Sequence, residues 1–293
     1  MRCRFCDGCP GGVAMADIIK NICLRIAYDG TDFFGFQCQS DFPSVQQTME
    51  EALEGLYGCR IRVYGAARTD TGVHARGQVV NFYAPDRIPV NKLPYALKGS
   101  LPPAIVVLDA VEKAYDFSVR HDNKGKHYRY IVVNGPAHDP FMLRYAWYIR
   151  KPLDIEAMQR AANTLIGTHD FSAYKGANTT PHNPVKTMYE IAVSRAGGRV
   201  RIDVLGSGFL YHMVRNIVGA LVDAGLYRKS PEALARILDG RDRRKLGATA
   251  PAQGLFLEEV FYTKDGVQKR RDALYAGRAS DTGSARCSDV SIK

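Results

Sequence analysis

Apolar residues recur with two different periods in the first part of this chain, and the period predicts the type of each element. Short apolar runs bounded by turn-forming residues predict strands over 21–28, 61–67, 78–82 and 104–111. Between the first two strands, apolar residues recur at helical spacing: Val45, Met49, Leu53 and Leu56. Ser44 and Gln47 form a capping box that starts this predicted helix, and a shorter helix is predicted over 90–97. The predicted order is βαββαβ.

The same order recurs in the second part of the chain, with one added helix. Apolar runs predict strands over 126–133, 185–193, 200–205 and 254–262. Helical spacing predicts helices over 155–166, 209–226 and 231–238. Gly197 and Gly198 stand between two of the strands and predict a hairpin turn. We therefore expect an α+β fold of two βαββαβ (ferredoxin-like) halves, with a mainly antiparallel sheet and helices on the outside.

This pattern divides the chain into four parts. We expect a disordered leader over 1–18, an N-terminal half over 19–115, a C-terminal half over 116–263 and a disordered basic tail over 264–293. The leader contains Cys3, Cys6 and Cys9 at a spacing that could hold a metal, but no fourth ligand stands nearby. Met15 is a candidate for the true start of the chain.

The net charge of the chain indicates what kind of partner the protein binds. The formal net charge of +10 suggests a polyanion, most commonly nucleic acid, although a generally basic protein without such a partner is the alternative. The seven cysteines are scattered, which is typical of a reducing compartment. The sequence has no apolar run of membrane-spanning length and no signal-peptide core, so we expect a cytoplasmic protein without a membrane. The histidines lack the spacing of a metal site.

The stretch R-T-D-T-G-V-H-A over 68–75 is the strongest candidate for chemistry. It follows one predicted strand and precedes another, and its Asp, Thr and Gly residues are turn formers. A scaffold can hold the Asp70 carboxylate rigidly there while leaving it open on one side. A plain structural turn is the alternative interpretation.

Two further stretches are candidates for substrate contacts. In K-H-Y-R-Y over 126–130, strand alternation separates Tyr128 from its neighbours, and its ring is either core or a platform for a base. In F-L-Y-H-M-V-R-N-I-V-G over 209–219, Arg215 lies beside the apolar stripe of a predicted helix. Arg215 is either a surface residue or the partner of a buried carboxylate.

Several motifs in order make the chain similar to the TruA-type tRNA pseudouridine synthases, from about Asn21 to Tyr262. They are Y-D-G-T at 28–31, G-F-Q at 35–37, A-R-T-D-T-G-V-H-A at 67–75, Y-R-Y at 128–130, G-T-H-D-F at 167–171, H-M-V-R-N-I-V-G at 212–219 and G-L-F-L at 254–257. Phe36 stands where this family often has tryptophan, and the leader and tail have no counterpart.

The resemblance implies the pseudouridine synthase fold and an isomerase that converts uridine to pseudouridine in the anticodon arm of tRNA, at positions 38 to 40. It implies a homodimer that needs no cofactor, no metal and no protein cofactor. It names Asp70 as the catalytic aspartate, Tyr128 as the ring against the target uracil and Arg215 as the ion-pair partner of Asp70.

The residue types fit this chemistry and leave two roles open. A carboxylate can attack the anomeric carbon or remove the 2′ proton of the ribose, and the target base must leave the stack first. Arg68 is a candidate for filling the vacated stack or holding a phosphate. His74 is a candidate for a structural or RNA-contacting role.

The sequence also suggests two rival functions. D-T-G occurs at 70–72 and 281–283, as in aspartic proteases, but Asp281 lies in the predicted tail without a strand on either side. A tRNA-binding chaperone fits the basic charge equally well, but binding alone has no use for an anionic residue facing phosphates.

Overall fold

The computed structural model describes residues 18–177, 179 and 183–281. They form two compact units, and the first comprises the described residues up to Tyr128 together with Pro251–Thr263. The second comprises Arg129–Ala250 and the described residues from Lys264. Each unit combines helices with strands, as the sequence predicts for an α+β fold. The predicted leader lies outside the described residues except for Ile18.

The sheet of the first unit is built around β3 (His74–Pro85). Its order is β4 (Ile105–Lys113), β1 (Ile19–Tyr28), β3 and β10 (Leu255–Phe261), and the short β2 (Tyr64–Gly65) also pairs with β3. β1 runs antiparallel to both β3 and β4, with Ile22 opposite Phe82. β10 runs parallel to β3, with Phe256 opposite His74.

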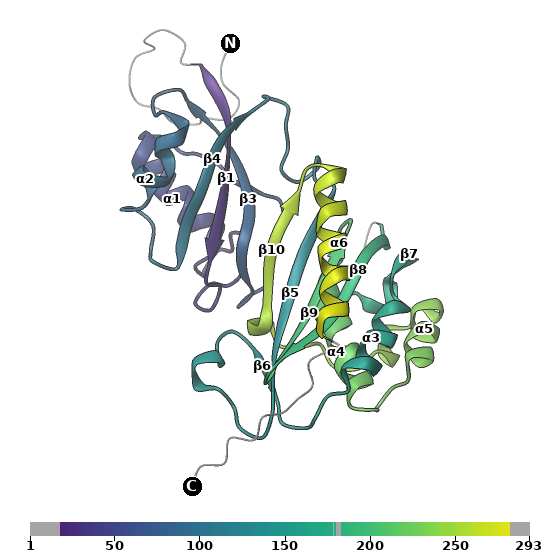
Figure 1. The fold of residues 1–293 in the computed structure, drawn as a ribbon. Helices are drawn as coiled ribbons and strands as arrows, with labels where there is room; N and C mark the ends of the chain where they lie inside the picture. The colour runs from purple at the N-terminus through teal and green to yellow at the C-terminus, as the bar shows by residue number, and fades with distance from the viewer. Residues whose placement is uncertain (1–17, 178, 180–182, 282–293) are drawn as a thin grey trace. The chain divides into compact units, whose positions relative to one another are not determined.

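Two helices cover one face of this sheet (Figure 1). They are α1 (Val45–Tyr57) and α2 (Leu93–Leu97), and a turn of 3-10 helix over Val90–Lys92 precedes α2. The Ser44 side chain caps α1 by accepting from the Gln47 N–H, as predicted. The Tyr57 ring of α1 meets the edge of the Phe82 ring of β3 at a centroid distance of 6.3 Å. The opposite face of β3 carries Asn81 and Tyr83, because side chains alternate along a strand.

The second unit has the strand order β5 (Gly125–Asn134, of which this unit contains the residues from Arg129), β9 (Arg199–Gly206), β8 (Val185–Ala196) and β7 (Gly167–Asp170). β6 (Trp147–Ile149) pairs with β5 in parallel. β8 and β9 form the predicted hairpin, with Ala196 opposite Arg199 across the two glycines. The helices of this unit are α3 (Ile155–Asn163), α4 (Met213–Gly225), α5 (Pro231–Gly240) and α6 (Lys264–Asp281).

The prediction of a disordered tail is wrong for Lys264–Asp281, which form α6. This helix packs against β8, and its Val267 and Leu274 side chains are buried. Arg278 makes an ion pair with Glu190 of β8, whose side chain is only 4 % exposed. Val267 and Leu274 lie on the same face of the helix, seven residues apart. Two apolar residues are too few to predict a helix from the sequence. Residues 282–293 lie outside the described part of the chain.

Other boundaries also differ from the predictions. The predicted strand 61–67 is reduced to Tyr64–Gly65. The predicted helix 209–226 begins at Met213, because His212 has φ of 58° in the left-handed region. β10 was predicted to end the second half, but its pairing with β3 places it in the first unit. The predicted division at 115/116 accordingly differs from the observed one after Tyr128. Among the described residues, no helix is long and apolar enough to cross a membrane.

Candidate active site

Asp70 lies in the loop between β2 and β3, and backbone hydrogen bonds fix this loop on both sides. The Phe36 N–H donates to the Thr69 carbonyl at 3.0 Å, and the Val73 N–H donates to the Asp70 carbonyl at 3.1 Å. The Tyr28 hydroxyl lies 2.7 Å from the Thr69 hydroxyl in a buried contact. These contacts hold the residue before Asp70 from two directions, so the Asp70 backbone has little freedom to move.

Two glycines let another loop approach the Asp70 loop closely. A Cβ atom on Gly30 would lie 2.0 Å from the Val73 carbonyl oxygen, which real side chains do not tolerate. Gly35 has φ of 89°, and a Cβ atom there would lie 2.8 Å from the Thr69 carbonyl oxygen. The Asp70 loop and the glycine-rich loop that follows β1 therefore pack backbone to backbone, which only glycine permits at these positions.

His74 follows this loop as the first residue of β3, and its side chain is buried. Its Nδ1 atom lies 3.0 Å from the Gly30 nitrogen and 3.1 Å from a carboxylate oxygen of Asp29. Its Nε2 atom lies 3.2 Å from the Gln253 carbonyl oxygen, and its ring stacks on Phe256 at 4.7 Å. With only 1 % of its surface exposed, His74 is placed to connect the Asp70 loop to β10 rather than to meet a large substrate.

Tyr128 lies on β5, in the same unit as Asp70, and is buried. Burial raises the pKa of its phenol far above the usual value, and the neighbouring Tyr28 and the Asp70 carboxylate raise it further. Because the Asp70 charge affects the pKa of Tyr128, the two side chains lie within range of electrostatic interaction. The sequence predicts these two residues as the catalytic group and the stacking group. A phenol with so high a pKa stays neutral throughout the physiological range.

Arg215 lies on α4 in the second unit. Its Nε donates to the Ala250 carbonyl at 2.8 Å, and the Ala250 N–H donates back to the Arg215 carbonyl at 3.2 Å. Burial raises the pKa of the Tyr130 phenol, and the Arg215 charge partly offsets this effect. Arg215 is thus held in place beside β5 of its own unit. Its pairing with Asp70 stays a prediction.

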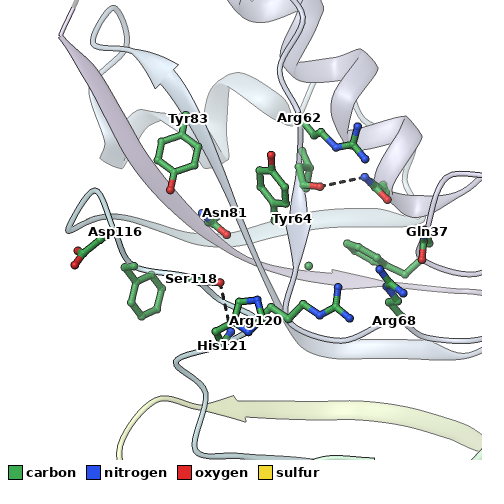
Figure 2. Close-up of a pocket in the computed structure, with 15 residues that line it drawn as sticks. Gln37, Arg62, Tyr64, Arg68, Asn81, Tyr83, Asp116, Ser118, Arg120 and His121 are labelled. Carbon is green, nitrogen blue, oxygen red and sulfur yellow. Dashed lines mark hydrogen bonds between the residues drawn. The ribbon is translucent and has the colours of Figure 1, made fainter. Parts of the chain in front are cut away.

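Arg68 is exposed and lines a cavity of about 490 Å³ in the first unit (Figure 2).

Sequence reasoning gave no role to several residues around the Asp70 loop: Tyr28, Gly30, Gly35 and Thr69. It also missed Arg62 and Arg120, which line the same cavity as Arg68. The density of glycine and aromatic residues over 28–37 was the one signal that pointed to a close loop contact.

Two remaining observations concern alternative sites. Within the described residues, no group of three or more His, Cys, Asp or Glu side chains is arranged to hold a metal ion. Asp281, which supplies the second D-T-G motif, is the last residue of α6. An aspartic protease needs its two aspartates on matched loops, so a helix end does not provide the second one.

The chain resembles known proteins over most of its length. The sequence profile of a family described as tRNA pseudouridine synthase matches residues 25–122 and 161–263. The tRNA pseudouridine synthase A of Brevibacillus brevis is 45 % identical over 244 residues, which cover 83 % of this chain and 100 % of that protein. The protein of the same name from Myxococcus xanthus is 44 % identical over 261 residues, or 89 % of this chain and 98 % of its own length. This chain therefore belongs to the tRNA pseudouridine synthase family.

Proposed function

We propose that this protein converts uridine to pseudouridine in the anticodon arm of tRNA, at positions 38 to 40, with Asp70 as the catalytic carboxylate. The observation that carries the proposal is the Asp70 loop itself: Thr69 is fixed by Tyr28 and Phe36, and the buried Tyr128 lies within electrostatic reach of Asp70. Catalysis needs a carboxylate whose position is set before the substrate arrives.

The reaction exchanges one bond of the uracil for another. The bond between N1 and the ribose C1′ breaks, the uracil turns, a bond forms between C5 and C1′, and the proton on C5 moves to N1 with solvent as intermediary. The Asp70 carboxylate starts the sequence either by attacking C1′ or by removing the 2′ proton. Both routes need the same single carboxylate beside the sugar.

The neutral state of Tyr128 supports one role for this residue. A phenol that keeps its proton is a poor base but a good flat surface, so Tyr128 packs against the uracil while the base is detached and turning. His74 positions the loop from behind, because it is buried and contacts Gly30 and Gln253. The exposure of Arg68 at the loop supports a role in entering the RNA stack or binding a phosphate.

Further features of the proposal come from the family resemblance. They are a homodimer, the absence of a cofactor, an action in the cytoplasm where tRNA is available, and a pairing of Arg215 with Asp70. Light scattering of the purified protein tests the dimer, and activity after dialysis against EDTA tests the absence of a metal requirement.

Release of tritium from tRNA labelled at C5 of uridine tests the function, because formation of the C5 glycosidic bond expels that atom. Carbodiimide mapping of the same tRNA then locates the product. The rival function is a chaperone that binds tRNA without modifying it. That protein would shift the labelled tRNA in a binding assay and release no tritium.

A further inference from the structure

The cavity that Arg68 lines is a feature of the first unit that the proposed catalytic step does not use. Its volume is about 490 Å³, which is sufficient for a nucleotide. Its wall includes the face of β2 and β3 that bears Tyr64, Asn81 and Tyr83, and the chain over 116–121 adds Phe117 and Arg120. Neither Asp70 nor Tyr128 is among the residues that line it.

One end of the cavity is strongly basic. Arg62, Arg68 and Arg120 line it, and none of the three makes an ion pair within the described part of the chain. Figure 2 shows the Arg120 side chain extending toward Arg68. Burial and the charge of Arg120 lower the pKa of the Arg68 guanidinium, so these two cations repel one another at close range. An anion bound between them would relieve that repulsion.

The other end presents aromatic rings and an acceptor. Figure 2 shows Tyr83 and Asp116 at the end away from Arg68, and Tyr64 and Phe117 also line the cavity. Asn21 donates its amide N–H groups to the carbonyls of Ala114 and Phe117 at 2.9 and 2.8 Å, so its Oδ1 must face Asn81.

The Asn81 amide is oriented by this arrangement. It donates to Asn21 Oδ1 at 2.8 Å, and its own Oδ1 accepts no hydrogen bond from any described residue. A carbonyl acceptor among aromatic rings suits the N–H edge of a nucleobase, because rings supply stacking and the amide supplies the hydrogen bond.

We propose that this cavity binds a second nucleotide of the tRNA, with its phosphate on Arg62, Arg68 and Arg120 and its base against Tyr64 and Tyr83. This proposal rests on the proposed function. Arg68 is two residues from Asp70, a distance of at most about 7 Å along the chain. The bound nucleotide is therefore a near neighbour of the target uridine in the RNA, and the cavity adds affinity for the RNA beside Asp70.

Three matched substitutions test the cavity in the full-length protein. Arg62→Gln and Arg120→Gln remove one cavity charge each. Arg60→Gln removes the same charge from an exposed position that does not line the cavity. The Kd for tRNA is measured by filter binding over a salt series, and the single-turnover rate is measured at saturating enzyme. Thermal melting confirms that each variant is folded.

We expect each cavity variant to raise the Kd about tenfold and to reduce the magnitude of the log–log salt slope by about 1, as the loss of one phosphate contact predicts. The saturated rate should stay within about twofold of wild type. Arg60→Gln should change the Kd by less than about twofold. Ethylation of one phosphate close to the target uridine should weaken binding to wild type and have a smaller effect on Arg120→Gln.

Several outcomes would overturn the proposal. Equal Kd values for the cavity variants and Arg60→Gln would show that the cavity holds no phosphate. A reduced saturated rate at an unchanged Kd would place the arginines in the chemical step instead. Saturable binding of uridine 5′-monophosphate at micromolar concentration without RNA would identify a site for free nucleotides. Failure of the proposed function is separate, since it appears as wild-type protein that binds tRNA and releases no tritium.

Discussion

Replacing Gly30 with alanine is expected to slow the reaction without touching any residue that contacts the substrate. The new Cβ atom would lie 2.0 Å from the Val73 carbonyl oxygen, and such contacts need at least 3.0 Å. One of the two loops must therefore move by about 1 Å. Val73 is three residues from Asp70, and its N–H donates a hydrogen bond to the Asp70 carbonyl. A movement of Val73 therefore displaces the Asp70 backbone and, with it, the carboxylate.

The size of the effect follows from the displacement. A misplacement of about 1 Å at a catalytic group costs on the order of a hundredfold in rate. We therefore expect the single-turnover rate of tritium release to fall about a hundredfold, equivalent to about 2.7 kcal/mol in the activation barrier. The Kd for tRNA should change much less, because the basic surface is unaltered. Overpacking should also lower the free energy of unfolding by about 1–3 kcal/mol.

Gly55 provides the matched control for this substitution. It lies exposed within α1 of the same unit, and a Cβ atom there meets nothing within 4 Å. Gly55→Ala should keep full activity and raise stability by about 0.5–1 kcal/mol, because alanine is the better helix former. A folded Gly30→Ala protein that reacts within threefold of wild type would refute the argument that this backbone contact positions Asp70.

Three further predictions concern other residues of the two units. Tyr128→Leu should slow the chemical step about ten- to a hundredfold by removing the stacking surface, whereas Tyr128→Phe should retain more activity; equal rates for the two would exclude stacking. Arg215→Met should slow the single-turnover rate about a hundredfold and Arg215→Lys less so, and wild-type kinetics in both would remove Arg215 from the site. Arg278→Met leaves the Glu190 carboxylate unpaired at 4 % exposure and should lower the free energy of unfolding in urea by about 3–5 kcal/mol, while the exposed control Arg271→Met should change it by less than about 0.5 kcal/mol.

The local pattern of the sequence predicts most elements of this fold, because each strand and helix buries one face. In β1 the large apolar residues Ile22, Leu24 and Ile26 alternate with smaller or polar ones, and they mark the face that packs beneath the helices. The partner of a strand leaves no such mark. β10 pairs with β3 through Phe256 and His74, which lie far apart in sequence, and no periodicity in either segment indicates the other.

The sequence predicts the chemical groups of the candidate site but not the contacts that hold them in position. Asp70 stands in a recognisable turn, but the contacts that fix this turn come from Tyr28 and Phe36, which lie much earlier in the sequence. The second nucleotide site was not foreseen, because Arg62 and Arg120 are ordinary surface arginines in sequence. Only the fold brings them together with Arg68 around one cavity.

The replacement of Asp70 by asparagine tests the central claim most directly. The amide has the same shape as the carboxylate but is neither a base nor a nucleophile, so binding and chemistry can be measured separately. We predict that Asp70→Asn binds tRNA with a Kd within about threefold of wild type. We predict that its single-turnover release of tritium falls by several orders of magnitude, equivalent to about 6 kcal/mol or more in the barrier. Residual activity within tenfold of wild type would show that Asp70 does not carry the reaction.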